Sequence, residues 1–236
     1  MFTRYVRRGD GVYDSDLFTI DADGSDERHL TTGPADDLYP NWSPDGQEVV
    51  FQRDAGDSQQ IWRVNADGGE PQRISTEVGN FSEPEFSPDG SQIAVGYVAP
   101  VSSTFSDIAV MNPATGHIEV LSDSGNGEIE PTWNPLGATI LYTMFERDGY
   151  RTYFLDAGSG RIGRVSSGPG ADVSPDAHPT ASPVRVDLLP RWSPDGTRVV
   201  FVRCTTDCIH SSLFIIGADG TRLHRLAEGG MPAWTA

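Results

Sequence analysis

Residues 40–46 read Pro40-Asn41-Trp42-Ser43-Pro44-Asp45-Gly46, and this pattern decides the fold. It returns as Pro84-Glu85-Phe86-Ser87-Pro88-Asp89-Gly90, as Pro131-Thr132-Trp133-Asn134-Pro135-Leu136-Gly137 and as Pro190-Arg191-Trp192-Ser193-Pro194-Asp195-Gly196. A truncated copy, Pro232-Ala233-Trp234-Thr235, follows. Apart from one longer step before Pro190, the spacing is close to the period of about 40 to 45 residues that is typical of a β-propeller. One aromatic slot recurs in every copy and is predicted to be structural: Trp42, Phe86, Trp133, Trp192 and Trp234.

Each copy predicts four short strands. The Pro-x-Trp segment is the first, and Ser-Pro-Asp-Gly turns the chain, because proline pre-sets φ and glycine accepts geometry that other residues resist. Two β-rich runs follow, as in Val49-Val50-Phe51 and Ile61-Trp62-Arg63-Val64, and a turn such as Asn65-Ala66-Asp67-Gly68 leads to the last strand. No helical pattern separates these runs. The sequence therefore predicts an all-β chain.

We predict a single β-propeller over residues 1–236, with five four-stranded blades. The N-terminus starts partway through a unit, because Phe2-Thr3-Arg4 aligns with Phe51-Gln52-Arg53. It lacks a first strand, and the C-terminus has one to spare. We therefore expect residues 232–236 to pair beside residues 2–6 as a closing strand, which would remove the exposed edges of an open array. The predicted blades are 2–31 with 232–236, 40–75, 84–122, 131–166 and 190–227.

The long step before Pro190 leaves a Pro- and Ser-rich insert, residues 168–187. Its Ala171-Asp172-Val173-Ser174-Pro175-Asp176 tract falls about one period after the preceding turn, so a sixth blade is the alternative to five. The tract stands too close to Ser193 to leave room for four strands. A long loop or an extra hairpin is the preferred interpretation.

The repeated Pro-x-Trp-Ser-Pro-Asp-Gly unit resembles the PD40 repeat of TolB-like β-propellers, and the terminal Pro-Ala-Trp-Thr resembles the closing strand of TolB chains. The resemblance covers essentially the whole sequence. It implies a protein-docking role, in which TolB binds a peptidoglycan-associated lipoprotein. Two features depart from TolB: its additional N-terminal α/β domain has no counterpart here, and its propeller has six blades.

The charge balance excludes several partners. The sequence contains 34 Asp and Glu residues and 17 Lys and Arg residues, which gives a net charge of −17. Affinity for phosphate backbones requires the opposite sign, so we expect no nucleic acid and no anionic membrane surface. No apolar stretch approaches the roughly 18 residues of a membrane span, and no apolar region follows the basic residues at the start as a signal peptide requires. We expect a monomer without membrane insertion, either intracellular or with its leader removed.

Acidic residues gather just ahead of the Pro-x-Trp segments. If those strands are innermost, as they are in similar propellers, the acids would ring one mouth of a central channel. Such a ring suits a Ca²⁺ ion or a cationic peptide end, and the alternative is a set of solvated loop acids. The candidate ligand-binding residues are Asp36, Asp37, Glu83, Glu128, Glu130 and Asp187, of which Asp37, Glu83, Glu130 and Asp187 are the candidate calcium ligands. No other cofactor is expected.

Two enzyme classes are alternatives to a binding role. The same acids could serve a glycoside-active enzyme, which needs two carboxyl groups at a defined separation. A prolyl-oligopeptidase-like peptidase carries a similar propeller, but its Gly-x-Ser-x-Gly elbow is not found in this sequence. His29, His117 and His224 scatter over fourth strands, and tracts such as Asp21-Ala22-Asp23-Gly24 lack the distal Glu of a calcium loop and are interpreted as turns. The preferred function is a non-enzymatic protein- or peptide-binding scaffold with no catalytic residue.

Cys204 and Cys208 are the only cysteines. A disulfide between them is the leading interpretation and would indicate an oxidising compartment. A metal site with His210 and a pair of free thiols stay open. Together with the resemblance, the cysteine pair favours a periplasmic or extracellular location.

Overall fold

The computed structural model describes residues 1–9, 11–54, 56, 58–100, 105–147, 149–165, 185–205 and 211–229. All regular elements in these ranges are β-strands, and they pair into five antiparallel sheets. No helix in these ranges is long and apolar enough to cross a membrane. The all-β propeller class predicted from the repeat is confirmed.

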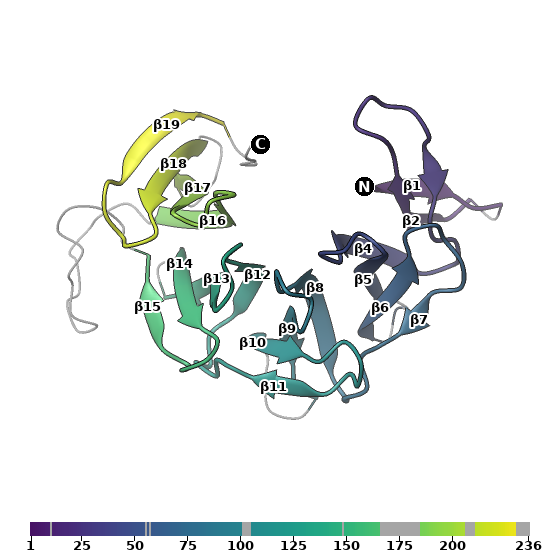
Figure 1. The fold of residues 1–236 in the computed structure, drawn as a ribbon, viewed down its shortest axis with the longest axis horizontal. Coiled ribbons are helices and arrows are strands. Elements are labelled where there is room, and N and C mark those ends of the chain that lie inside the picture. The colour runs from purple at the N-terminus through teal and green to yellow at the C-terminus, as the bar shows by residue number, and fades with distance from the viewer. Residues whose placement is uncertain are drawn as a thin grey trace. The chain divides into compact units, whose positions relative to one another are not determined.

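Residues Met1–Gly125 form a first unit that contains three of the sheets. Within each sheet, neighbouring strands follow one another in the chain, as Figure 1 shows. The first sheet contains β1 (Phe2–Arg7), β2 (Tyr13–Thr19) and β3 (Arg28–His29). The second contains β4 (Asp36–Trp42), β5 (Glu48–Asp54), β6 (Gln59–Asn65) and β7 (Gln72–Arg73). The third contains β8 (Asn80–Phe86), β9 (Ile93–Val98), β10 (Asp107–Met111) and β11 (Ile118–Val120).

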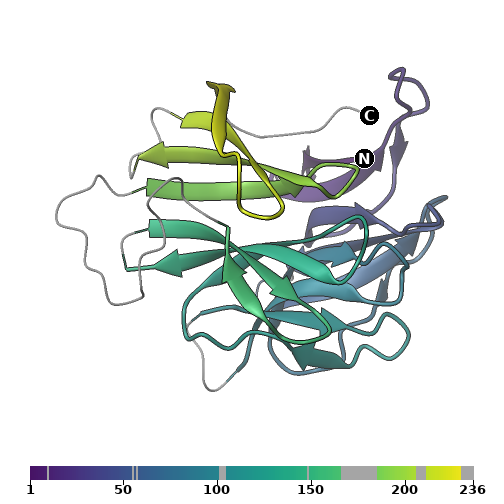
Figure 2. The ribbon, with the colours of Figure 1, turned by 60° about the vertical axis from the view of Figure 1, so that its left-hand side comes forward.

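Residues Asn126–Ala236 form a second unit with two four-stranded sheets, coloured green to yellow in Figure 2. One contains β12 (Glu128–Trp133), β13 (Thr139–Glu146), β14 (Gly149–Asp156) and β15 (Ile162–Arg164). The other contains β16 (Arg185–Trp192), β17 (Arg198–Thr205), β18 (Ser211–Gly217) and β19 (His224–Glu228). Strand β16 begins inside the segment that the sequence assigned to an insert, so residues 185–187 belong to the sheet.

The Ser-Pro-Asp-Gly turns are held by a local hydrogen-bond pattern. The Ser43 hydroxyl donates to Asp45 at 2.6 Å and accepts from the Glu48 amide at 2.9 Å. Gly46 completes the turn with a φ of 69°, where a glycine is favoured. The same bonds recur at Ser87 with Asp89 and at Ser193 with Asp195. Because every bond is local, the turn forms wherever the motif occurs.

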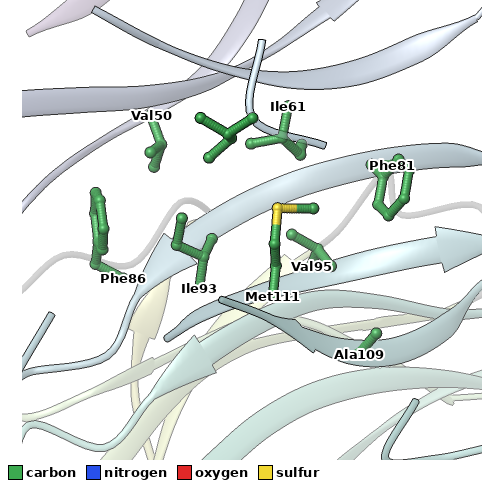
Figure 3. Packing of buried hydrophobic residues seen from close by; sticks show 9 residues of the cluster. Val50, Ile61, Phe81, Phe86, Ile93, Val95, Ala109 and Met111 are labelled. Carbon is green, nitrogen blue, oxygen red and sulfur yellow. The ribbon is translucent and has the colours of Figure 1, made fainter. Parts of the chain in front are cut away.

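The cores lie between the sheets of each unit. In the first unit, Phe81 and Met111 of the third sheet pack with Val50 and Ile61 of the second, as Figure 3 shows. In the second unit, Leu141 packs with Phe201 and the other members of its cluster, Trp192, Val199 and Ile216. Alternating side chains on the middle strands therefore serve two neighbouring sheets.

The repeated aromatic slot is buried in three of the four copies that the structure describes. Phe86, Trp133 and Trp192 are 8%, 5% and 9% exposed, whereas Trp42 is 39% exposed. Trp234 and the predicted closing strand, residues 232–236, lie outside the described residues. Closure, the single domain and the choice between five and six blades stay predictions, as does the tract at residues 171–176, which also lies outside.

Candidate functional site: carboxylates of the first strands

A β-bulge interrupts the first strand of four sheets at the same position. The residue just before the proline has a positive φ in each case: 52° at Tyr39, 52° at Glu83, 58° at Glu130 and 53° at Leu189. The strand register shifts at each of these points, between Leu38 and Asn41 in β4 and at the matching places in β8, β12 and β16. A positive φ costs free energy in a non-glycine residue. Because it recurs in four sheets, the bulge is a conserved element of the repeat within this chain.

The bulge divides the predicted acids into two classes. Glu83 and Glu130 occupy the bulge itself, whereas Asp37 and Asp187 lie earlier, on the regular ladder. All of them belong to the first strands, which begin several residues before the Pro-x-Trp motif. The sequence placed them just ahead of the Pro-x-Trp strand and treated them as one equivalent set. The structure corrects both points.

Asp37 is the buried partner of Arg53. It is 1% exposed, and its two oxygens accept from Arg53 Nε at 2.7 Å and from Nη2 at 2.8 Å. The Arg53 guanidinium lies over the rings of Phe51 and Trp62, 5.3 and 4.7 Å from their centroids. Bidentate, charge-assisted bonds of this length are strong, and the aromatic stack holds the arginine in place.

The same constellation recurs in the second unit. Asp187, 2% exposed, accepts from Arg203 Nε at 2.6 Å and from Nη2 at 2.8 Å. Arg203 lies over Phe201 and Phe214, 5.1 and 4.9 Å from the ring centroids. Two of the predicted ligand carboxylates are therefore already engaged by arginines of their own sheets.

Arg4 takes the corresponding place in the first sheet. It lies over Phe2 and Phe18, but its carboxylate partner is Glu27, bound through both oxygens at 2.7 Å. This pair is exposed, at 45% for Arg4 and 40% for Glu27. The change of partner follows from the sheet: β1 is its edge strand, and no described first strand supplies an aspartate beside Arg4.

Glu128 and Glu130 play different parts on β12. Glu128 is fully buried and lies opposite Met144 in the register. At the matching positions of β5 and β17, the residue opposite the acid is an arginine. Glu130 Oε2 accepts from the Leu189 amide at 2.9 Å and from the Thr143 hydroxyl at 3.1 Å. Leu189 is the bulge residue of the next first strand, so the carboxylate ties one bulge to another.

Asp36 is also a connector. Its Oδ1 accepts from the Ser15 amide at 2.7 Å and joins β4 to the first sheet. Asn80 repeats this bond one sheet later, where its Oδ1 accepts from the Gln59 amide at 3.0 Å. Glu83 is half-buried on the β8 bulge. Asp36, Asp37, Glu130 and Asp187 thus each accept hydrogen bonds that hold the sheets together.

No group of three or more His, Cys, Asp or Glu residues within the described ranges could hold a metal ion. The calcium site at Asp37, Glu83, Glu130 and Asp187 stays a prediction. Asp23 of the Asp-x-Asp-Gly tract accepts from the Ser25 amide and hydroxyl, as a turn residue does.

The three histidines that the structure describes lie in separate environments. His29 stacks on Phe18 with ring centroids 4.3 Å apart, and its Nε2 is 2.7 Å from the buried Asp16. His117 contacts Glu77, and His224 contacts the Arg222 carbonyl. Sequence reasoning missed the network around Asp16, in which Arg8 donates to Asp14 and Asp16. The Asp14-Ser15-Asp16 alternation on a predicted strand was the available signal.

Cys204 is 4% exposed on β17 and is disulfide-bonded. Cys208 and His210 lie outside the described residues, so the pairing of the two cysteines stays a prediction.

The propeller sheets and the bulged first strands define the class, and the family follows from a direct match. The family model of the TolB beta propeller domain, PD40, matches residues 6–179. The chain belongs to this family.

Solved structures share the fold at low identity. TolB from Acinetobacter baumannii aligns with a TM-score of 0.72 at 17% identity, over 92% of this chain and 50% of that one. A putative TolB from Agrobacterium tumefaciens aligns with a TM-score of 0.72 at 19% identity, over 98% of this chain and 83% of that one. An oligogalacturonate lyase in complex with manganese aligns at 0.64 and 15% identity, over 95% of this chain and 61% of that one. This chain therefore spans half the length of the first of these proteins.

Proposed function

We propose that this chain is a non-enzymatic binding propeller whose partner is a protein or peptide with an exposed cationic segment. Family membership supports the binding role, because TolB-like propellers are typically protein-interacting domains. The net charge of −17 supports a cationic partner, which such a surface attracts at long range.

The observation that carries the proposal is the pair of bulge residues Tyr39 and Glu83. They occupy the same position on β4 and β8, which are neighbouring strands of the first unit. Tyr39 is 52% exposed and Glu83 is half-buried. An aromatic face and a carboxylate together suit a lysine or arginine side chain, through cation–π attraction and a charge-assisted hydrogen bond.

The contacts of the other carboxylates argue against a catalytic role for them. General acid–base chemistry needs a carboxyl group that can exchange a proton with the substrate. Asp37 and Asp187 are buried and give both oxygens to arginines, and Glu130 holds a backbone amide. These contacts favour structural roles.

Two alternatives keep specific support from the comparisons. One is a glycoside-active enzyme, since an oligogalacturonate lyase shares the fold. The other is a propeller of a larger peptidase, since a putative dipeptidyl aminopeptidase IV from Bacteroides ovatus also shares it, with this chain covering 34% of that one.

The experiment measures the anisotropy of a fluorescein-labelled peptide that contains lysines, beside a control peptide with glutamine at those positions. We expect saturable binding of the lysine peptide alone, weakened about tenfold by Glu83→Gln or Tyr39→Ala. Glu77→Gln is the matched control, because it removes one exposed carboxylate of the same unit. Equal binding of both peptides would contradict the proposal. So would turnover of glycosides or peptides that Glu83→Gln or Glu130→Gln abolishes.

Calcium binding and a monomeric state are retained as proposals. Comparing the unfolding midpoint in millimolar Ca²⁺ with that in chelator tests the first. We expect a higher midpoint in Ca²⁺, because a ligand that binds only the folded state stabilises it. Sedimentation equilibrium tests the second.

A further inference from the structure

Strand β1 lies at the edge of the first sheet, where β2 is its only partner among the described strands (Figure 1). All of its residues, from Phe2 to Arg7, pair with β2 without a register shift. The first strands of the other four sheets differ, because each carries a β-bulge and a proline. Bulges and prolines protect the edge of a sheet from further pairing. Strand β1 has neither of them.

The hydrogen-bond pattern shows which backbone groups this edge presents. The Arg8 amide donates to the Val12 carbonyl at 2.7 Å, so these two residues form a bonded pair. Opposite residues in an antiparallel ladder alternate between bonded and non-bonded pairs, so every second residue back from Arg8 also bonds to β2. The amide and carbonyl groups of Thr3, Tyr5 and Arg7 therefore point away from β2. They are placed to bond to one further strand.

The predicted closing strand leaves most of this edge open. In the second sheet, Asp37 lies three residues before the proline of its strand and pairs with Arg53. The residue that matches Asp37 in the C-terminal repeat, opposite Arg4, is Gly229. The Gly229 amide already donates to the Ser211 carbonyl beside β18, at 3.0 Å. A closing strand in the register of β4 would therefore not reach Arg4.

The open part of the edge is cationic. Residues 1–9 contain three arginines and no acidic residue, in a chain whose net charge is −17. Arg4 binds the exposed Glu27, and exposed ion pairs contribute little stability, so another carboxylate can take the place of Glu27. Arg7 is exposed, and the Tyr5 side chain is 75% exposed. Both arginines are therefore accessible to acidic side chains of an added strand.

We propose that the β1 edge from Arg4 to Arg7 binds an extended acidic segment of a partner protein as an added antiparallel strand. In strand addition of this kind, the main-chain hydrogen bonds supply affinity and the side chains supply specificity. Opposite charges that face each other across two strands stabilise the pair. Because the two arginines are three residues apart, the segment needs the pattern Asp-x-x-Asp. The site is independent of the proposed lysine-peptide site, which attracts the opposite charge.

Three fluorescein-labelled peptides test the proposal by anisotropy. The first, Thr-Asp-Val-Thr-Asp-Val-Thr, has the required spacing and a sequence that favours a strand. The second has asparagine in place of both aspartates. The third is N-methylated on its central threonine, which would lie opposite Tyr5, and so loses a main-chain donor. We expect the first peptide to bind saturably and about tenfold more tightly than either of the others.

Two variants test the location. Tyr5→Pro removes an amide that points away from β2, and an edge strand tolerates proline at such a position. Tyr5→Ala keeps that amide and is its control. Arg7→Gln removes one of the two cations, and Arg28→Gln is its control, because Arg28 is an exposed arginine at the other edge of the same sheet. We expect Tyr5→Pro and Arg7→Gln to weaken binding of the first peptide about tenfold, and the controls to change it less than about threefold.

Circular dichroism establishes that each variant is folded. Equal binding of the three peptides, or unaltered binding by Arg7→Gln, would overturn the proposal. Absence of peptide binding would also overturn it and would assign the edge to another occupant. Self-association in sedimentation equilibrium that Tyr5→Pro abolishes would then identify that occupant as a second copy of the chain.

Discussion

Arg53 donates hydrogen bonds to both carboxylate oxygens of Asp37, at 2.7 and 2.8 Å. Asp37 is buried, with only 1% of its surface exposed. The pair joins β4 to β5 beside the bulge at Tyr39. Arg203 and Asp187 repeat it between β17 and β16. A residue that sequence reasoning assigned to ligand binding is therefore part of the sheet.

Asp37→Asn is expected to destabilise the fold strongly. Removing one partner of a buried ion pair leaves an uncompensated charge, at a cost of about 3 to 5 kcal/mol. The free energy of unfolding in urea measures the loss. Glu27→Gln breaks the exposed pair with Arg4 and serves as the control, with only a small effect expected. A loss at Asp37 no greater than that at Glu27 would contradict the structural role.

Glu130→Ala should also destabilise, because the Leu189 amide loses its acceptor. An unsatisfied donor costs about 1 to 3 kcal/mol when it is buried, and the half-buried Leu189 amide should fall at the low end of that range. Thr143→Val removes the hydroxyl that donates to the same oxygen at 3.1 Å and leaves the amide bond in place, so its effect should be smaller. Urea unfolding of both variants checks the order, and a larger loss for Thr143→Val would refute the tie between the two bulges.

Acid should weaken the Ser-Pro-Asp-Gly turns within a defined range. Hydrogen bonds from Ser87 and Ser193 lower the pKa of Asp89 and of Asp195 to about 2. Since the pKa of an unfolded aspartate is about 3.9, the turns contribute their full stability above about pH 4 and lose it as the pH falls through about 2. Unfolding midpoints between pH 2 and 5 test this. The double variant Asp89→Asn and Asp195→Asn should show a shallower pH dependence, and an identical slope would count against the turn chemistry.

Gly116→Ala should be far more damaging than Gly24→Ala. Both glycines have a positive φ, 72° and 87°, where a side chain is strained by about 1 to 2 kcal/mol. Only at Gly116 would the new Cβ also meet a neighbour, Ile74 O at 2.0 Å. Thermal unfolding of the two variants isolates the contact from the strain. Equal midpoints would show that the turn does not pack as described.

The fold could be predicted from the sequence because its signals are local. Ser43 and Asp45 bond within one turn, and the same bonds return wherever the motif does. The site could not be predicted, because the motif does not encode the strand register. The bulge before each proline puts Glu83 in the bulge of its strand, whereas Asp37 lies on the regular ladder of its own strand. The pairing of Asp37 with Arg53 was visible only as the joint occurrence of Asp-x-x-Pro and Phe-x-Arg in two of the blades.

The central claim assigns Asp37 to stability and Glu83 to recognition, and one comparison tests it directly. The dissociation constant of the labelled lysine peptide is measured at 10 °C, under conditions in which circular dichroism shows each variant to be folded. The account predicts that Glu83→Gln weakens binding about tenfold with an unchanged unfolding midpoint, and that Asp37→Asn lowers the midpoint but binds within twofold of the wild type. Loss of binding in folded Asp37→Asn together with unaltered binding by Glu83→Gln would contradict it.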